Sequence, residues 1–365
     1  MSRFRRRTLS GVGMFVTASL PCAAFEPIAF TPIGMLPGGN SSYATAVSGD
    51  GSVIVGYAAT TQSLSGHRAV RWTSAGGLVD LGSNAQFSGS LALGVSSDGM
   101  VPVGTIETST SFTAGRWTPS GVVQLGAVLS DALGASNDGS VIVGAHTVAG
   151  ATQAFRWSAA TGVVNLGAAP GTTTGMARAI SADGSTIVGD GGTAAAHTAF
   201  RHTEAQGMVP IPPLPLGTAT LANGVSADGS VVVGRSNGAF GTVAYRWSEP
   251  TGTVPLGTLP GNAISTAVGV SGDGSIVVGY CDGGASQAAF IWTESGGMQN
   301  LQQLLGSAVP PGWTLYLASA ISADGKTIVG DGKFNGQSQG WVATIPAPAS
   351  ASALVLGFAL LRRRR

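Results

Sequence analysis

A repeated tetrapeptide constrains the fold of this chain more than any other feature. The pattern Ser-x-Asp-Gly occurs seven times, and successive copies are 48, 40, 45, 45, 45 and 51 residues apart. A repeat of this length is typical of architectures in which each copy is one supersecondary unit. The aspartates of the pattern are Asp50, Asp98, Asp138, Asp183, Asp228, Asp273 and Asp324.

Each copy carries signals for four strands, here called a to d. Strand a ends at the Ser-x-Asp-Gly turn, and strand b is a β-branched run such as Val141–Gly144. Strand c contains a segment such as Ala154–Trp157, and strand d one such as Val163–Gly167. Asp-Gly is a strong hairpin signal because the turn requires positive φ. Four antiparallel strands in this length match a propeller blade, whereas a β-helix coil is shorter. We therefore predict an all-β fold, a seven-bladed β-propeller of four-stranded antiparallel blades.

The two ends of the repeat array predict how the ring closes. The last copy has strands a to c, the last of them around Gln339–Val342, and then runs into a proline-rich segment. Near the N-terminus, Thr31–Gly38 closely matches Thr253–Gly261, a strand d with the loop that follows it. We predict that residues 28 to 38 form the outer strand of the last blade, which removes the free edges of the ring.

The N-terminal residues have the pattern of a secretory signal. Arg3–Arg7 form a charged region, Gly11–Leu20 an apolar stretch, and Ala24 ends a small-residue cleavage site. We expect residues 1–24 to be a signal peptide, residues 25–345 the propeller, and residues 346–365 a C-terminal sorting or anchor segment. After cleavage Cys281 is the remaining cysteine, so no intrachain disulfide is expected.

The C-terminal segment resembles the PEP-CTERM sorting signal of Gram-negative bacteria. Pro346 and Pro348 precede an apolar run, Ala349–Leu361, and four arginines end the chain. Ala347 stands where the family has glutamate. The resemblance implies an exosortase-like processing enzyme, transient membrane contact through the tail, and release to the cell surface or extracellular space. The alternative is a plain tail anchor.

The repeat itself resembles the HAF-repeat family of bacterial extracellular proteins. The resemblance rests on Ser-x-Asp-Gly-Ser, Ala-Phe-Arg-Trp and Gly-Met-x-x-Leu-Gly, and covers residues 28 to about 345. The family carries no assigned catalytic residues, so the resemblance implies an extracellular repeat protein without indicating a reaction.

The charge of the chain argues against nucleic-acid binding. The formal net charge is +1, but eight of the 18 basic residues lie at the termini. Residues 25–345 carry ten basic and 17 acidic side chains, so their net charge is 10 − 17 = −7. A surface of this sign repels phosphate backbones.

Three recurring side chains have both a structural and a functional interpretation. The aspartates are either metal ligands or turn residues, and turns spread around a ring favour the second. The aromatic residues of strand c are either a glycan-stacking stripe or packing between blades, and we favour packing. The arginines before them need carboxylate or carbonyl partners if buried, for which the recurring aspartate is a candidate. The tryptophans are Trp72, Trp117, Trp157, Trp247, Trp292 and Trp341, and the fourth copy has His202 instead.

The sequence lacks three common motifs of metal, phosphate and redox sites, namely HExxH, a P-loop and CxxC. We therefore expect a non-catalytic surface or matrix protein, a monomer without cofactor, that binds an extracellular polysaccharide or a surface protein. The alternative is a secreted propeller enzyme acting on glycans. It requires a pair of carboxylates at one mouth of the central channel.

The loops predict which face binds. The a–b and c–d turns share one rim and are nearly uniform, whereas the b–c loops and d–a connections share the other rim and vary. Recognition is common on loops held by a rigid scaffold, so we predict that the variable rim binds the ligand. The alternative is that these loops vary because nothing constrains them. The candidate binding residues are Tyr57, Phe112, Arg235, Phe240, Tyr280, Asp282 and Trp313.

Overall fold

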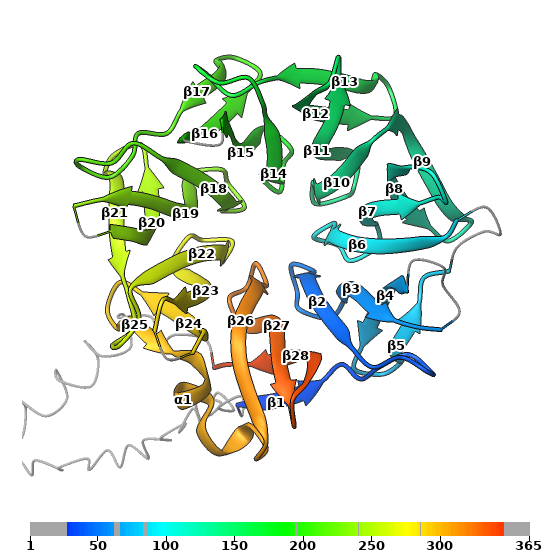
Figure 1. Ribbon diagram of the computed structural model, residues 1–365, viewed down its shortest axis with the longest axis vertical. Coiled ribbons are helices and arrows are strands. Elements are labelled where there is room, and N and C mark those ends of the chain that lie inside the picture. Colours follow the sequence, from blue (N-terminus) through cyan, green and yellow to red (C-terminus); the bar gives the residue numbers. More distant parts are fainter. Residues whose placement is uncertain are drawn as a thin grey trace, which may run out of the picture.

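Seven four-stranded antiparallel sheets are arranged in a ring in the computed structural model (Figure 1). The structure describes residues 28–346 except 62–65, 83–86, 194–195, 240 and 285. The predicted signal peptide and C-terminal segment therefore lie outside the described residues, apart from Pro346. Within the described part, no helix is long and apolar enough to cross a membrane. The predicted seven-bladed propeller is confirmed.

The blades follow one another along the chain, each from its innermost to its outermost strand. Blades 1 to 4 are β2 (Ser42–Val47), β3 (Ile54–Ala59), β4 (His67–Thr73), β5 (Gly77–Asp80); β6 (Gly89–Val95), β7 (Pro102–Glu107), β8 (Phe112–Thr118), β9 (Gly121–Val128); β10 (Ser130–Ala135), β11 (Val141–Val148), β12 (Ala151–Ser158), β13 (Gly162–Gly167); and β14 (Met176–Ile180), β15 (Thr186–Thr193), β16 (Ala196–Thr203), β17 (Gly207–Pro210).

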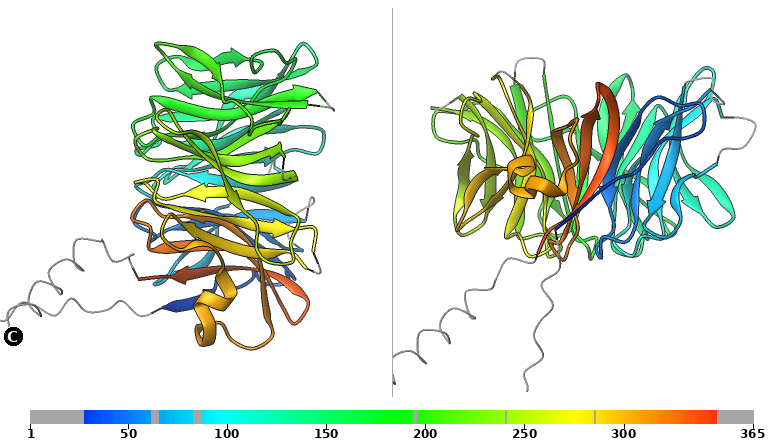
Figure 2. Two further views of the ribbon diagram at one scale, coloured as in Figure 1. Left: turned by 90° about the vertical axis from the view of Figure 1, so that its left-hand side faces the viewer. Right: turned by 90° about the horizontal axis from the view of Figure 1, so that it is seen from below.

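Blade 7 differs from the others because its outermost strand comes from the N-terminal part of the chain. Between blades 6 and 7 the chain forms a short helix, which lies at the periphery of the disc in the edge-on views of Figure 2. Blades 5 to 7 and these helical turns are β18 (Thr220–Val225), β19 (Val231–Gly238), β20 (Gly241–Ser248), β21 (Gly252–Gly257); β22 (Ile264–Val270), β23 (Ile276–Asp282), β24 (Ala288–Thr293), β25 (Gly297–Asn300); α1 (Leu301–Leu305), η1 (Gly306–Ala308); and β26 (Trp313–Ile321), β27 (Thr327–Phe334), β28 (Gln337–Thr344), β1 (Ala29–Pro32).

The ring closes as predicted, with a shorter strand. β1 pairs antiparallel with β28, from Ala29 opposite Thr344 to Pro32 opposite Trp341 (Figure 1). The next residue, Ile33, leaves the sheet and is buried between blades 7 and 1. The paired segment is therefore four residues long, and the rest of residues 28–38 connects the two blades.

The recurring aspartates hold the a–b turns, which confirms their predicted structural role. Asp228 shows the pattern: its Oδ1 accepts hydrogen bonds from Ser226 Oγ (2.6 Å), Ser230 N (3.0 Å) and Ser230 Oγ (2.8 Å). These bonds favour the ionised form and lower the pKa of Asp228. Gly229 follows at φ 73°, in the left-handed region that glycine adopts without strain.

The second residue of each Ser-x-Asp-Gly turn takes part in a closed ring of interblade hydrogen bonds. In each turn an amide N–H, from this residue or the aspartate after it, donates to the carbonyl of the same residue in the next blade, at 2.8–3.2 Å. The last bond, from Asp324 N to Gly49 O, returns to blade 1. The residues whose carbonyls accept are Gly49, Ser97, Asn137, Ala182, Ala227, Gly272 and Ala323.

Aromatic residues of strand c pack between neighbouring blades, as predicted. Trp157 packs against a core of blade 2 and blade 3 residues, and Trp117 is buried. Trp341 is also buried in a core of blade 6 and blade 7 residues, but at a different place in strand c. It lies opposite Gly330, as Phe155 lies opposite Gly144, and Ala343 occupies the position that Trp157 has in blade 3.

The arginines of strand c do not pair with the turn aspartates. The Arg116 guanidinium lies 4.8 Å from the ring centroid of Trp157 in the next blade. Arg246 Nε donates to the carbonyl of Gly274, 3.2 Å away in the next blade's turn. Asp190 pairs with Arg178 and contacts His197, neither of which belongs to this set of arginines. The prediction that the turn aspartate binds these arginines is therefore wrong. The observed partners are an aromatic ring for Arg116 and a backbone carbonyl for Arg246.

Candidate functional site

The innermost strands line a channel that is wide at one end and narrow at the other. The wide part is a cavity of ≈ 720 Å³, which we call the channel mouth. The narrow part, ≈ 170 Å³, lies toward the Ser-x-Asp-Gly turns. Both parts share a ring of small and branched apolar side chains. This ring consists of Val95, Ala135, Ile180, Val225, Val270 and Ile321.

A β-bulge in each innermost strand directs one side chain into the channel mouth. The register of strand a against strand b shifts at the same place in all blades, which leaves one residue unpaired. Bulges commonly re-aim side chains next to functional sites. The unpaired residues, all of which line the cavity, are Thr45, Leu93, Leu133, Arg178, Asn223, Val268 and Ser319.

The glycine that ends the β-branched run of strand b makes room for this bulge. A Cβ on Gly234 would lie 1.9 Å from the Leu221 carbonyl oxygen, and one on Gly189 would lie 1.9 Å from that of Met176. A side chain at these positions therefore cannot coexist with the bulged strand. The glycines recur in the sequence because backbone approaches backbone there.

The residue after this glycine supplies a second set of side chains near the channel. Of this set, Tyr57, Arg235, Tyr280 and Asp331 line the channel mouth. We expected Tyr57, Arg235 and Tyr280 in b–c loops, but they lie in β3, β19 and β23, because strand b continues past the glycine. The structure thus brings three of the predicted candidates together at one cavity.

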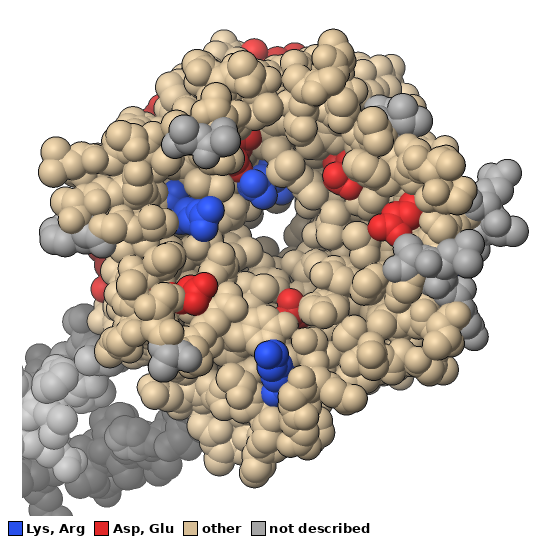
Figure 3. All heavy atoms as spheres, in the orientation of Figure 1, with Lys and Arg blue, Asp and Glu red and all other residues tan. Residues whose placement is uncertain are grey.

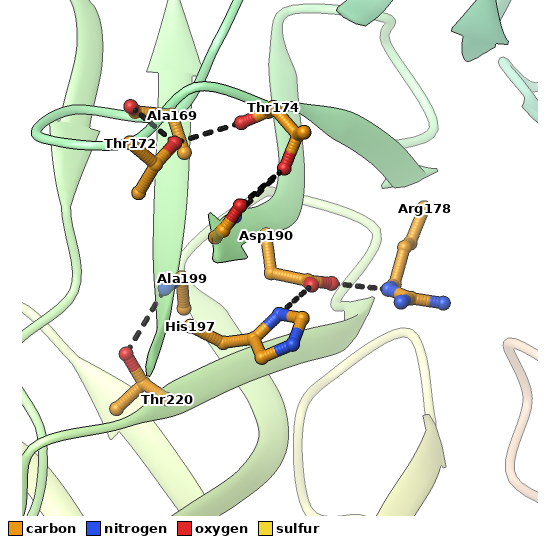
Figure 4. Close-up of polar contacts among 9 residues, drawn as sticks. Ala169, Thr172, Thr174, Arg178, Asp190, His197, Ala199 and Thr220 are labelled. Carbon is orange, nitrogen blue, oxygen red and sulfur yellow. Dashed lines mark hydrogen bonds and ion pairs between the residues drawn. The ribbon is translucent and has the colours of Figure 1, made fainter. Parts of the chain in front are cut away.

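Arg178 is held at the channel mouth by a buried carboxylate (Figure 4). Its Nε donates to Oδ1 of Asp190, while Nδ1 of His197 lies 3.2 Å from Oδ2 of the same carboxylate. The Asp190 side chain is 4% exposed and that of Arg178 33%. In Figure 4 the terminal nitrogens of Arg178 point away from Asp190. The carboxylate therefore fixes the guanidinium and leaves its outer edge open.

Two polar side chains of blades 5 and 6 continue this side of the channel mouth. Asn223 Nδ2 donates to the carbonyl of Ala267 at 2.8 Å, which fixes the amide and leaves its oxygen as an acceptor. Thr266 is 5% exposed, and its Oγ1 has no hydrogen-bond partner among the described residues. A buried hydroxyl without a partner is costly in a folded protein, so this one is unusual.

The opposite side of the channel mouth holds a buried acid among tyrosines. Asp331 Oδ1 accepts a hydrogen bond from Ala44 N at 3.0 Å, and burial raises the pKa of Asp331 to about 7. Tyr57 stacks on Tyr43 with ring centroids 4.7 Å apart, and burial raises the pKa of Tyr57 to about 12. This side is therefore far less basic than the side with Arg178 and Arg235. Figure 3 shows basic and acidic side chains around the central opening.

The other predicted binding residues that the structure describes do not line the channel mouth. Asp282 is exposed at the end of β23, where its carboxylate accepts a hydrogen bond from Gly283 N at 2.7 Å. Phe240 lies outside the described residues. The expectation that Trp313 offers a stacking face is corrected. It is 5% exposed, and its ring packs against Phe30 and Phe334.

Phe112 lines a second cavity of ≈ 890 Å³ between blades 2 and 3. Glu107 and Asp131 line the same cavity. Thr105 Oγ1 donates to Asp131 Oδ1 at 2.6 Å. Burial raises the pKa of Asp131, and the nearby charge of Glu107 raises it further. This side cavity therefore joins an aromatic ring with two carboxylates, one of them with a raised pKa.

Sequence reasoning missed several residues of the channel mouth. Arg178, Asn223 and Asp331 line the cavity, and Asp190 holds Arg178. These residues could have been found from the sequence, because the residue type at their positions in strands a and b differs from copy to copy. The prediction considered only the loops, which differ in length, and not substitutions inside the strands.

The fold and this cavity define a closed seven-bladed propeller with a polar central channel. No family model matches the chain, and no curated protein matches it either. Among solved structures it is similar to an oligogalacturonate lyase in complex with manganese (14% identity, 89% of this chain and 94% of that one, TM-score 0.55). It is also similar to the β-propeller domain of the Trilobed protease from Pyrococcus furiosus (8%, 83% and 94%, 0.56). A third similar structure is a prolyl endopeptidase (10% identity, TM-score 0.56), of which the match covers 52%. At these identities the likeness is one of fold.

Proposed function

We propose that this protein is an exported, non-catalytic binding propeller that takes an extracellular polymer or a surface protein at the channel mouth. The observation that carries the proposal is the distribution of variation. The turns, the glycine and the interblade core recur in every blade, while the positions facing the channel mouth differ. Polar side chains of both signs line this cavity, including Arg178, Arg235, Asn223 and Asp331.

The rigidity of the surrounding scaffold supports the same proposal. The closed ring of turn hydrogen bonds and the paired β1 fix the blades relative to one another. Binding sites that are ordered before the ligand arrives lose less entropy on association. The export part of the proposal rests on the N-terminal signal pattern and on the resemblance to extracellular repeat proteins.

Binding of the purified protein to a glycan array and to the host's extracellular matrix tests this function. We expect Arg235→Gln and Tyr280→Ala to weaken binding about tenfold or more without lowering the melting temperature. Lys326→Gln is the matched control, because it removes a positive charge on the opposite rim, beside a Ser-x-Asp-Gly turn. The proposal is wrong if Lys326→Gln weakens binding and the two channel variants do not.

A secreted enzyme acting on glycans is the second candidate, favoured by the side cavity. Glu107 and Asp131 line one cavity, and the raised pKa of Asp131 suits a proton donor. Glycosidases use such a carboxylate pair. Release of new reducing ends from a glycan, abolished by both Glu107→Gln and Asp131→Asn, would establish this activity. Turnover that both variants retain would exclude this pair as its source.

A further inference from the structure

The channel mouth is electrostatically one-sided. Blades 4 and 5 contribute the guanidinium groups of Arg178 and Arg235, while Asp331 lies across the channel in blade 7. Asp190 balances the charge of Arg178. Arg235 lacks a carboxylate within ion-pair distance in the described part of the chain. Counting the charges of Arg178, Arg235 and Asp190, this side of the cavity therefore carries a net charge of about +1.

The repeat places the unsatisfied hydroxyl of Thr266 beside Arg235. In blades 2 and 3 the equivalent residues are Thr105 and Asp131, whose side chains are hydrogen-bonded at 2.6 Å. The equivalence follows from the registers, in which Thr105 pairs with Leu91 and Arg235 with Leu221. A ligand group that reaches Arg235 is thus within reach of a hydroxyl that otherwise has no partner.

The remaining groups on this side suit an oxyanion on a sugar. The Arg178 side chain is 33% exposed and lines the cavity, and guanidinium groups bind carboxylates through paired N–H donors. The Asn223 oxygen can accept a hydrogen bond from a sugar hydroxyl. The ring of Tyr280, in the neighbouring blade 6, lines the same cavity and offers a face for stacking. A uronic-acid residue carries several hydroxyls beside its carboxylate, whereas the group beside a peptide C-terminal carboxylate is a single amide N–H.

Building on the proposed function, we infer that Arg178, Arg235, Asn223 and Thr266 form a subsite for the carboxylate of a uronic-acid residue in an acidic polysaccharide. Asp190 is a positioning residue in this subsite, because it acts through Arg178.

Calorimetry with oligoglucuronate, and with the same oligosaccharide after reduction of its carboxylates to alcohols, tests the inference on the full chain. We expect the acidic oligosaccharide to bind and the reduced one to bind at least about tenfold more weakly, with an affinity for the acidic form that falls as salt rises. Arg235→Gln should weaken binding about tenfold or more, and Arg235→Lys should restore part of it.

Two further variants separate a ligand role from a structural one. Lys333→Gln removes an exposed positive charge near the end of β27, outside the cavity residues, and should leave the affinity unchanged. Thr266→Val keeps the shape and removes the unpartnered hydroxyl, so it should weaken binding while the melting temperature stays the same or rises.

Equal binding of acidic and reduced oligosaccharides, or an equal loss with Lys333→Gln, overturns the uronate subsite. Binding of a peptide C-terminus in place of the oligosaccharide overturns it as well. In each case the proposed function stands if Tyr280→Ala still weakens binding of the ligand found. The uronate subsite and the proposed function are both wrong if no channel variant changes the affinity for that ligand.

Discussion

At the level of the single residue, the aspartates discussed above fall into two classes that differ in burial and in the pKa of the carboxyl group. Turn aspartates such as Asp228 are exposed and accept hydrogen bonds, which lower their pKa. Their stabilisation is present above the unfolded value of 3.8 and is lost as the pH falls below it. Asp331 is buried and accepts a hydrogen bond from Ala44 N, and burial raises its pKa to about 7. Its folded state prefers the proton, so stability falls as the pH rises from about 4 to about 7.

Asp331→Asn should therefore stabilise the protein at pH 8 and have little effect at pH 4. The rise from 3.8 to about 7 corresponds to at most about 4 kcal/mol in the free energy of unfolding. Asparagine keeps an oxygen for Ala44 N, and Tyr57 and Tyr316 nearby stay neutral over this range because burial raises the pKa of each to about 12. Urea denaturation of both proteins at the two pH values measures the difference. An identical difference at pH 4 and pH 8 would contradict the burial argument.

At the level of the element, the bulge in strand a depends on the glycine of strand b that faces it. The sequence allowed the strands, turns and closing segment to be predicted, because Asp-Gly turns and β-branched runs act locally. The bulge was not predictable from that pattern. The bulge results from contact between strands a and b. In the sequence, the glycine that permits this contact appears only as the last residue of the β-branched run. The channel-facing residues Arg178 and Asn223 were missed for the same reason.

Gly234→Ala tests this coupling. Because the new Cβ would lie 1.9 Å from the Leu221 carbonyl oxygen, we expect a loss of about 3 kcal/mol or more in the free energy of unfolding. Gly134→Ala is the control, since a Cβ there meets nothing closer than 3.4 Å, and it should cost less than about 1 kcal/mol. Equal losses for the two variants, measured by chemical denaturation, would show that the bulge does not require the glycine.

At the level of the whole molecule, closure depends on residues far apart in the chain. β1 completes the sheet of β28, and the ring of turn hydrogen bonds ends where it began, at Gly49. The repeat predicted this closure because the last copy lacks strand d and the N-terminal segment supplies one. No local pattern predicts the ring of turn bonds, since each of its bonds joins two blades.

A chain that starts at Tyr43 lacks β1 and the buried side chains of Ile33 and Leu36. These two side chains alone contribute about 4 kcal/mol, and the exposed edge of β28 adds to the loss. We expect a strongly lowered melting temperature and aggregation, whereas a chain starting at Ile28 should melt like the longer protein. Similar melting of the two truncated chains in calorimetry would refute closure by β1.

The central claim is that ligand binds at the channel mouth, and hydroxyl-radical footprinting with mass spectrometry tests it most directly. The protein is labelled with and without the matrix polymer that it binds. The account predicts protection of Tyr57 and Tyr280 in the channel mouth, with unchanged labelling of Met100 beside a Ser-x-Asp-Gly turn on the opposite rim. Protection of Met100 with unchanged labelling of the two tyrosines would contradict it.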